Sequence, residues 1–173
     1  VATAHRWYNW LYCNHLVDFS RLRSNLHESQ LNFKLLKPFK LDRDISTNEL
    51  IPFYGLQDLE FDFSSLISKD KFNLIIHPKS KGHGREWGLE NYYQLIKRLP
   101  ADDYSVYITG LKEEEDSVRT ELPQLFEIKG ITNLMGKFSL QELQSFIKQV
   151  DGLVASGTGV LHLASAMGKY TVG

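Results

Sequence analysis

Short apolar segments alternate with helical patterns through the C-terminal part of this 173-residue chain. The apolar segments are 72–77, 104–109, 131–134, 152–155 and a fifth that begins at Tyr170. The helical patterns between them are 89–99, 113–122, 139–150 and 160–167. Strands that alternate with helices of about ten residues are typical of βαβ units, which build a parallel sheet. The sequence therefore predicts a Rossmann-like α/β fold with helices on both faces of the sheet.

The segment 151–168, DGLVASGTGVLHLASAMG, reads as a buried strand, a glycine turn and a helix. Gly157 and Gly159 allow a sharp turn and the close approach of a ligand. Ser156 and Thr158 can cap the helix, whose first N–H groups favour an anion. His162 is expected one turn into the helix, facing the same end. We interpret the segment as a phosphate-binding turn with an imidazole beside it; an ordinary βα turn with a packed histidine is the alternative.

Ligands of open parallel sheets bind beyond the carboxyl ends of the strands. The loop 78–88, which follows the first strand, carries Ser80, Lys81 and Arg85. A hydroxyl can donate to a phosphate oxygen, and a guanidinium can hold a phosphate with two hydrogen bonds where a lysine acts as a point charge. We interpret this loop as a phosphate-binding loop; a solvated basic loop is the alternative.

The loop after the second strand carries three consecutive acids, Glu113, Glu114 and Glu115. A carboxylate at the end of a strand can accept both hydroxyls of a ribose. Three acids in a row are also typical of a solvated helix start, since acids favour the positive end of the helix dipole. Together with the glycine turn and the basic loop, these acids predict a pocket for a nucleotide diphosphate.

The sequence has neither the glycine-rich fingerprint of dinucleotide-binding proteins nor a P-loop. Its histidines and its single cysteine, Cys13, do not have the spacing of metal ligands. We therefore expect a pocket that works without a metal or cofactor, with Arg85, Lys81 and helix N–H groups neutralising the diphosphate. The net charge of −1 gives no indication of nucleic-acid binding.

Hydrophobic residues make up 42% of the chain, which suffices for a folded core. No apolar run reaches the roughly 18 residues that span a bilayer. The aromatic segment Trp7, Tyr8, Trp10 and Tyr12 is expected to pack in a core, and 64–69 is expected to form a short helix. The chain starts without a methionine and stops at the beginning of a strand, so we expect a fragment of a longer protein.

A series of motifs resembles the C-terminal domain of glycosyltransferase family 9, the lipopolysaccharide heptosyltransferases. The motifs are IIHPKS, REW, YITG followed by Glu114, NLMGKFSLQEL and ASGTGVLHLASAMG. RWYNWLYCN and LHESQLN resemble the inter-domain region of that family. The resemblance implies a GT-B fold, in which two Rossmann-like domains face each other, here with an incomplete second domain. It implies the end of the acceptor-side domain at 1–40, a connector at 41–70 and a truncated nucleotide-sugar-binding domain at 71–173.

The resemblance also implies an activity. The family moves a sugar, a heptose, from ADP-heptose to the lipopolysaccharide core with inversion and without a metal, and the nucleotide sugar is a substrate rather than a cofactor. It implies a cytoplasmic protein, peripheral at most at the inner face of the inner membrane, with no nucleic-acid partner. A non-catalytic nucleotide-binding module and a relative that uses another nucleotide sugar are the alternatives.

Site residues follow from the matched motifs. By resemblance, Ser80 and Arg85 bind the diphosphate, Glu114 binds the ribose and Met135 lines the adenine pocket; Thr158, Gly159 and His162 meet the diphosphate and sugar. Two positions depart from the family: Gly157 stands where an aspartate is usual, and Lys79 stands where a small glycine is usual. The family's catalytic base is an acid of the N-terminal domain, so no residue of this chain is assigned as base.

Overall fold

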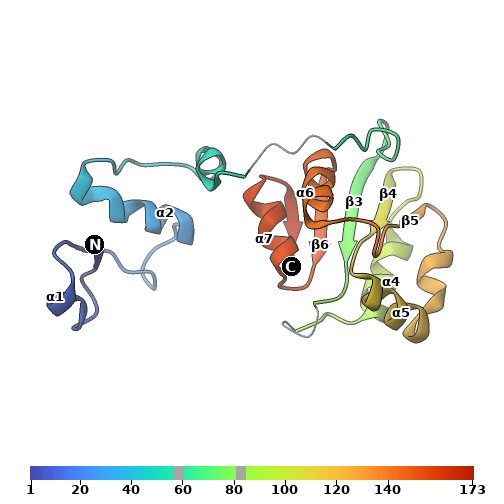
Figure 1. Ribbon diagram of the computed structural model, residues 1–173, viewed down its shortest axis with the longest axis horizontal. Coiled ribbons are helices and arrows are strands. Elements are labelled where there is room, and N and C mark those ends of the chain that lie inside the picture. Colours follow the sequence, from blue (N-terminus) through green and yellow to red (C-terminus); the bar gives the residue numbers. More distant parts are fainter. Residues whose placement is uncertain (57–60, 81–84) are drawn as a thin grey trace. The chain divides into compact units, whose positions relative to one another are not determined.

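The computed structural model describes residues 1–56, 61–80 and 85–173. The chain forms two compact units, Val1–Gly55 and Leu56–Gly173, which are coloured blue to cyan and green to red in Figure 1. Lys81, one of the expected phosphate ligands, lies outside the described residues. The units are therefore described one at a time, beginning with the larger.

The larger unit is built on a five-stranded parallel sheet (Figure 1). Its strands are β3 (Phe72–His77), β4 (Tyr104–Ile108), β5 (Ile131–Asn133), β6 (Gly152–Ala155) and β7 (Tyr170–Val172). They lie in the order β5-β4-β3-β6-β7, and every neighbouring pair is parallel. This confirms the predicted parallel α/β sheet, and from Phe72 onward each predicted strand or helix end lies within one residue of the observed one.

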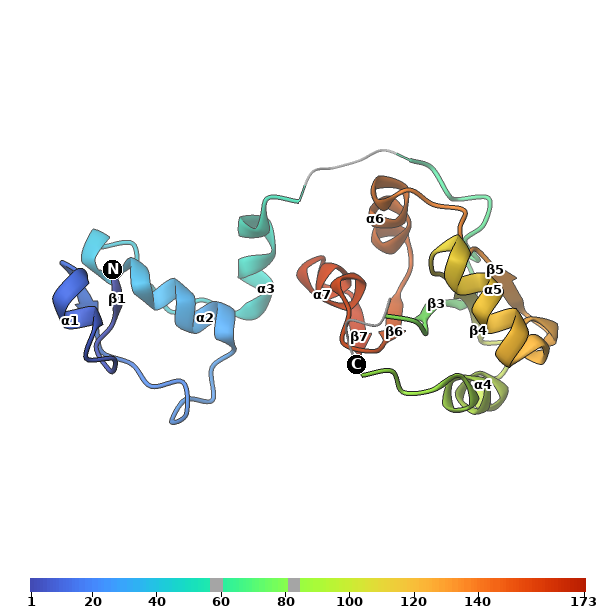
Figure 2. The same cartoon turned by 60° about the horizontal axis from the view of Figure 1, so that its bottom comes forward.

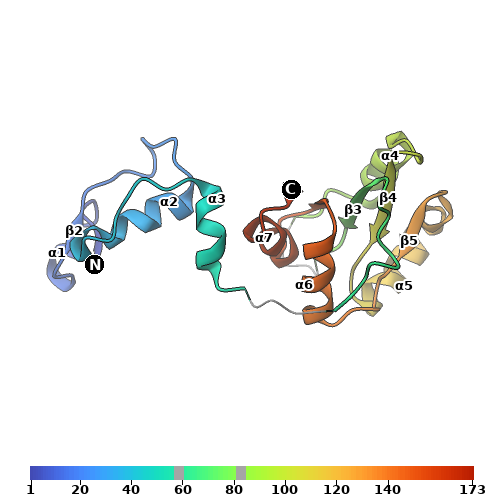
Figure 3. The same cartoon turned by 90° about the horizontal axis from the view of Figure 1, so that it is seen from above.

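Helices cover both faces of the sheet, as Figures 2 and 3 show. They are α4 (Leu89–Arg98), α5 (Lys112–Glu121), the 3-10 helix η3 (Pro123–Glu127), α6 (Leu140–Gln149) and α7 (Gly159–Ala166). One core contains buried residues of α4, α5 and η3, and the other contains buried residues of α6 and α7. Side chains of β3 alternate between them, because successive strand residues point to opposite faces: Ile76 belongs to the first core and Ile75 to the second.

The strand order places a switch point between β3 and β6. From β3 the chain moves outward to β4 and β5, then returns to the other side of β3 for β6 and β7. At such a point the connections leave in opposite directions, which opens a crevice beyond the carboxyl ends of the two strands. The residues just after His77 and Ala155 are therefore expected to line this crevice.

The smaller unit contains short elements. These are β1 (Ala2–Thr3), α1 (Asn9–Tyr12), β2 (Leu16–Val17), α2 (Glu28–Phe33), the 3-10 helix η1 (Lys34–Phe39), α3 (Thr47–Leu50) and the 3-10 helix η2 (Ile51–Tyr54). The prediction that its aromatic segment packs in a core is wrong, since Trp7, Trp10 and Tyr12 are 76%, 67% and 83% exposed. α1 is a single turn, and the Trp10 indole N–H donates to the Ala4 carbonyl at 2.8 Å while most of the residue stays in solvent.

The prediction of a helix at 64–69 is also wrong, because this segment forms turns. The Asn73 side chain accepts from the Ser68 N–H and donates to the Ser68 carbonyl, both at 2.9 Å. It thereby takes the backbone groups that a helix would have used. Among the described residues, no helix has both the length and the apolar character needed to cross a membrane.

Candidate functional site

A cavity of about 410 Å³ lies beyond the carboxyl ends of β3, β4, β5 and β6, at the switch point. Polar residues from the strand ends and the following loops line one part of it: His77, Lys79, Ser80, Thr109, Glu114 and Thr158. Apolar residues line another part: Leu111, Leu134, Phe138, Leu140, Leu143 and Val160. A cavity of this size suits a small ligand with one flat apolar group and several polar ones.

The glycine turn after β6 forms part of this cavity. Thr158 is the N-cap of α7, and its Oγ1 accepts from the Leu161 N–H at 3.4 Å, as the sequence predicted. Gly157 and Gly159 both line the cavity, and neither has the positive φ that glycine adopts most easily. A Cβ at either position would meet no atom within 4 Å. These glycines therefore keep open space in front of the helix N-terminus, where N–H groups can meet an anion.

The three acids at the start of α5 point to different surroundings. Glu114 lines the cavity, and its Oε2 accepts from the Leu111 N–H at 2.7 Å. Glu113 is exposed. Glu115 is buried and accepts from Lys112, Arg119 and Asn133 at 2.6–2.9 Å, and these bonds lower its pKa to about 2. Of the three, Glu114 is the one placed to meet a ligand.

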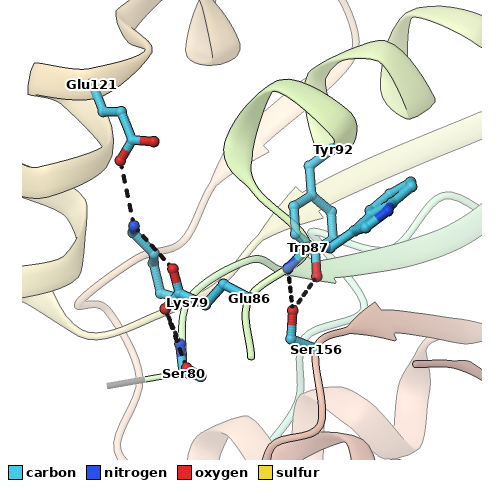
Figure 4. A network of polar contacts seen from close by, with 7 residues as sticks. All are labelled: Lys79, Ser80, Glu86, Trp87, Tyr92, Glu121 and Ser156. Carbon is cyan, nitrogen blue, oxygen red and sulfur yellow. Dashed lines mark hydrogen bonds and ion pairs between the residues drawn. The ribbon is translucent and has the colours of Figure 1, made fainter. Parts of the chain in front are cut away.

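The loop after β3 brings Lys79 and Ser80 to the same cavity (Figure 4). The backbone N–H and the hydroxyl of Ser80 donate to Glu86 Oε1 at 2.9 and 3.2 Å. Lys79 Nζ lies 3.2 Å from Glu86 Oε2 and 3.4 Å from Glu121 Oε2. Burial opposes the charge of both Lys79 and Glu86, yet contacts with Glu86 and Glu121 raise the pKa of Lys79, and hydrogen bonds from the Ser80 N–H and from Lys79 lower the pKa of Glu86.

A second cavity, of about 550 Å³, adjoins the glycine turn and is lined by Arg85, Glu86, Trp87, Tyr92 and other residues. Gly157 lines both cavities, whereas Arg85 lines only the second and Thr158 only the first. The structure therefore brings together Ser80, Glu114, Thr158 and Gly159 of the predicted site residues. It places Arg85 in the neighbouring cavity.

Two other expected site residues line neither of these cavities. Met135 is 1% exposed and lies in the first core, with its Cε only 2.5 Å from the position that a Cβ on Gly110 would take. Since Gly110 does line the first cavity, Met135 lies directly beneath its wall. His162 lies in α7, one turn beyond Thr158, and is exposed.

Sequence reasoning assigned no role to part of the cavity wall, although it placed His77 at the start of the loop after the first strand. The His77 ring nitrogen Nδ1 lies 3.0 Å from Thr109 Oγ1, joining the ends of β3 and β4. Burial lowers the pKa of His77, although the charge of Glu114 opposes this shift. Both residues end or directly follow an apolar strand, and this position was the available signal. The apolar side chains from α6 and its preceding loop lie within the motif NLMGKFSLQEL, but the sequence predicted no ligand contact for them because they resemble ordinary core residues.

Among the described residues, no group of three His, Cys, Asp or Glu side chains is arranged to hold a metal ion. The chemical features of the first cavity are instead a carboxylate, a lysine, hydroxyls and a helix N-terminus beside an apolar wall. This set matches the parts of a nucleotide diphosphate: a base, a ribose and two phosphates.

Comparisons with known proteins identify a family for this chain. The family described as "Glycosyltransferase family 9 (heptosyltransferase)" matches residues 7–173. A Haemophilus influenzae protein whose given name suggests a glycosyltransferase is 27% identical over 100% of this chain and 52% of its own length. The lipopolysaccharide core heptosyltransferase OpsX of the same organism is 25% identical over 69% of this chain and 33% of its own. The chain thus spans about half or less of these relatives.

Solved structures show the same fold. The E. coli heptosyltransferase WaaC with ADP-2-deoxy-2-fluoro heptose matches with a TM-score of 0.64 and 16% identity, over 98% of this chain and 50% of that one. A glycosyl transferase of family 9 from Veillonella parvula matches with a TM-score of 0.58 and 15% identity, over 94% and 47%. These matches confirm the predicted GT-B-type fold.

Proposed function

The chain belongs to glycosyltransferase family 9, and on this premise we propose that it supplies the donor-binding part of an enzyme that moves a sugar from a nucleotide diphosphate to a lipopolysaccharide core acceptor. The nucleotide sugar is a substrate, and the proposal includes no cofactor or metal. A heptose carried by ADP is the first candidate donor, since heptosyltransferases are among the relatives. The proposed place of action is the cytoplasmic face of the inner membrane, where such an acceptor is accessible.

One observation carries the proposal: a single cavity at the switch point contains both an apolar wall and the start of α7. The base would lie against the apolar side chains of Leu134, Phe138 and Leu143. Glu114 would accept the ribose hydroxyls, and the N–H groups beyond Thr158 would bind the diphosphate. An arrangement of this kind can neutralise a diphosphate by hydrogen bonds and helix dipole.

The proposed reaction is an inverting displacement at the anomeric carbon. The acceptor oxygen forms the new bond to that carbon while the bond to the phosphate oxygen breaks. The proton of the acceptor hydroxyl goes to a base outside this chain, and the nucleotide diphosphate leaves with the bonding electrons. The α7 N-terminus would stabilise the charge that develops on the leaving group, with Arg85 approaching from the neighbouring cavity.

Gly157 favours a second candidate within the same reaction class, a different donor sugar. By resemblance an aspartate is usual at this position, and here a Cβ would meet no atom within 4 Å. The chain therefore has open space instead of a carboxylate beside the α7 start. Two kinds of donor sugar would fit this space: one without a hydroxyl that binds the carboxylate, and one bulkier than the sugar that the carboxylate accommodates.

Calorimetric titration of the intact protein with ADP, GDP, UDP and CDP tests the proposal. We expect binding of at least one nucleotide diphosphate, weakened about tenfold by Glu114→Gln because a charged acceptor for the ribose is lost. Glu113→Gln is the matched control, since it removes the same charge from an exposed neighbour. Turnover of the matching nucleotide sugar distinguishes a transferase from a non-catalytic binding module. Absence of binding to all four nucleotides would contradict the proposal.

A further inference from the structure

Three hydrogen-bond donors of the β3–α4 connection converge on the carboxylate of Glu86 (Figure 4). The backbone N–H and the hydroxyl of Ser80 lie 2.9 and 3.2 Å from Oε1. Lys79 Nζ lies 3.2 Å from Oε2. A backbone N–H, a hydroxyl and an ammonium are the groups with which proteins hold phosphate oxygens.

The donors and their acceptor belong to different cavities. Lys79 and Ser80 line the cavity proposed for the nucleotide, together with Thr158 and Gly159, whereas Glu86 lines the neighbouring cavity. The carboxylate therefore reaches these donors from outside the nucleotide cavity. Its two oxygens occupy positions that two oxygens of a phosphate group could take.

We propose that Lys79 and Ser80 form an anion subsite for a phosphate of the nucleotide diphosphate, and that Glu86 fills this subsite until the ligand displaces it. This inference rests on the proposed function of the cavity and adds two residues to it. It gives Lys79 a role as a phosphate ligand and makes Glu86 an internal competitor that sets the affinity for the nucleotide.

The charges around the subsite favour such an exchange. Lys79 also lies 3.4 Å from Glu121, so its ammonium keeps one carboxylate partner when Glu86 moves away. The Glu86 side chain is 29% exposed and borders a cavity of about 550 Å³ that can receive it. A diphosphate carries more charge than one carboxylate and forms stronger charge-assisted hydrogen bonds with the same donors.

Titrations of the intact protein with ADP and with inorganic pyrophosphate test the inference in three variants. Glu86→Gln weakens the competitor with little change of shape, and we expect it to bind both ligands about three- to tenfold more tightly. Glu90→Gln is the matched control: it removes the charge of an exposed α4 residue that accepts from Gln94 rather than from Lys79 or Ser80, and its affinities should stay within about twofold of the wild type. Lys79→Gln should bind both ligands about tenfold more weakly.

The outcomes separate this inference from the proposed function. If the wild type binds ADP and Glu86→Gln binds both ligands equally well or more weakly, Glu86 is a support for the loop and the inference is overturned. If no variant binds any nucleotide but pyrophosphate binds more tightly to Glu86→Gln, the subsite stands and the proposed function fails. Melting temperatures show whether Glu86→Gln is misfolded. If it is, Lys79→Gln provides the test, and an unchanged affinity of Lys79→Gln for pyrophosphate also overturns the inference.

Discussion

The hydroxyl of Ser156 lies 3.0 Å from the hydroxyl of Tyr92 and also accepts from the Trp87 backbone N–H at 3.1 Å (Figure 4). Ser156 directly follows β6 and begins the glycine turn, whereas Tyr92 lies in α4. One buried hydroxyl therefore fixes the segment that carries Arg85 and Glu86 against the turn that carries Gly157. The relative position of the two cavities depends on this contact.

Ser156→Ala should destabilise the protein by about 1–2 kcal/mol, because it leaves the buried Tyr92 hydroxyl and the Trp87 N–H without their partner. Urea unfolding measures the free energy of unfolding. Ser165→Ala, on the exposed side of α7, is the control and should change it by less than about 0.5 kcal/mol. Equal stability of the two variants would show that the hydroxyl contributes little.

Arg85→Ala in the intact protein should weaken binding of a nucleotide diphosphate about tenfold, since a guanidinium near a diphosphate forms charge-assisted hydrogen bonds. Calorimetry provides the measurement. Arg98→Ala removes the same charge from the exposed end of α4 and should leave affinity unchanged. Because Arg85 lines the neighbouring cavity, unchanged affinity in Arg85→Ala would assign the diphosphate to the first cavity alone.

By resemblance His162 meets the diphosphate and sugar, so His162→Ala should lower donor turnover by about tenfold or more, although its side chain lines neither cavity. Its melting temperature should change little, since His162 is exposed. Steady-state kinetics of sugar transfer and a thermal melt of the same preparation test both statements. Normal turnover would remove His162 from the site.

Glu115→Gln should lower the free energy of unfolding by about 1–2 kcal/mol at pH 7, because the buried carboxylate accepts from Lys112, Arg119 and Asn133. The pKa of Glu115 in the folded protein is about 2, below its ordinary value of 4.5, chiefly because it accepts hydrogen bonds from Lys112 and Arg119. The contribution is therefore present above pH 4.5 and is lost as the pH falls toward 2. Denaturant titrations from pH 7 to 3 should show the two proteins converging, and the exposed Glu113→Gln should follow the wild type throughout.

Sequence patterns predicted the larger unit well because local signals and tertiary structure agree there. A capping box of Ser139 and Glu142 starts α6, and Thr158 caps α7 as predicted. The failure at 64–69 has a non-local cause, since Asn73 takes the backbone groups of Ser68. The aromatic segment near Trp10 failed for another reason: composition indicated burial, but a one-turn helix leaves large rings exposed.

The position of the site in the fold was predictable from the sequence, but the contacts between its side chains were not. Strand ends predicted that Ser80, Thr158 and the acids 113–115 are neighbours, because all parallel strands end at one edge of the sheet, and only the family resemblance singled out Glu114. No local pattern could separate Glu114 from Glu115, since one helical step decides which faces the cavity and which faces Asn133. The contact of Glu86 with Ser80 spans a loop, and a spacing in the sequence does not indicate which way a loop closes.

The central strand β3 forms hydrogen bonds with β6, and its Asn73 N–H donates to Asp151, 78 residues later in the chain. During synthesis, the edge of β3 that pairs with β6 therefore stays unpaired until most of the unit has left the ribosome. Pairing over such a separation carries a large loop-closure cost and makes folding slow. Between the synthesis of β4 and the synthesis of β6, β3 therefore exposes an unpaired edge to which a chaperone that shields such edges would bind.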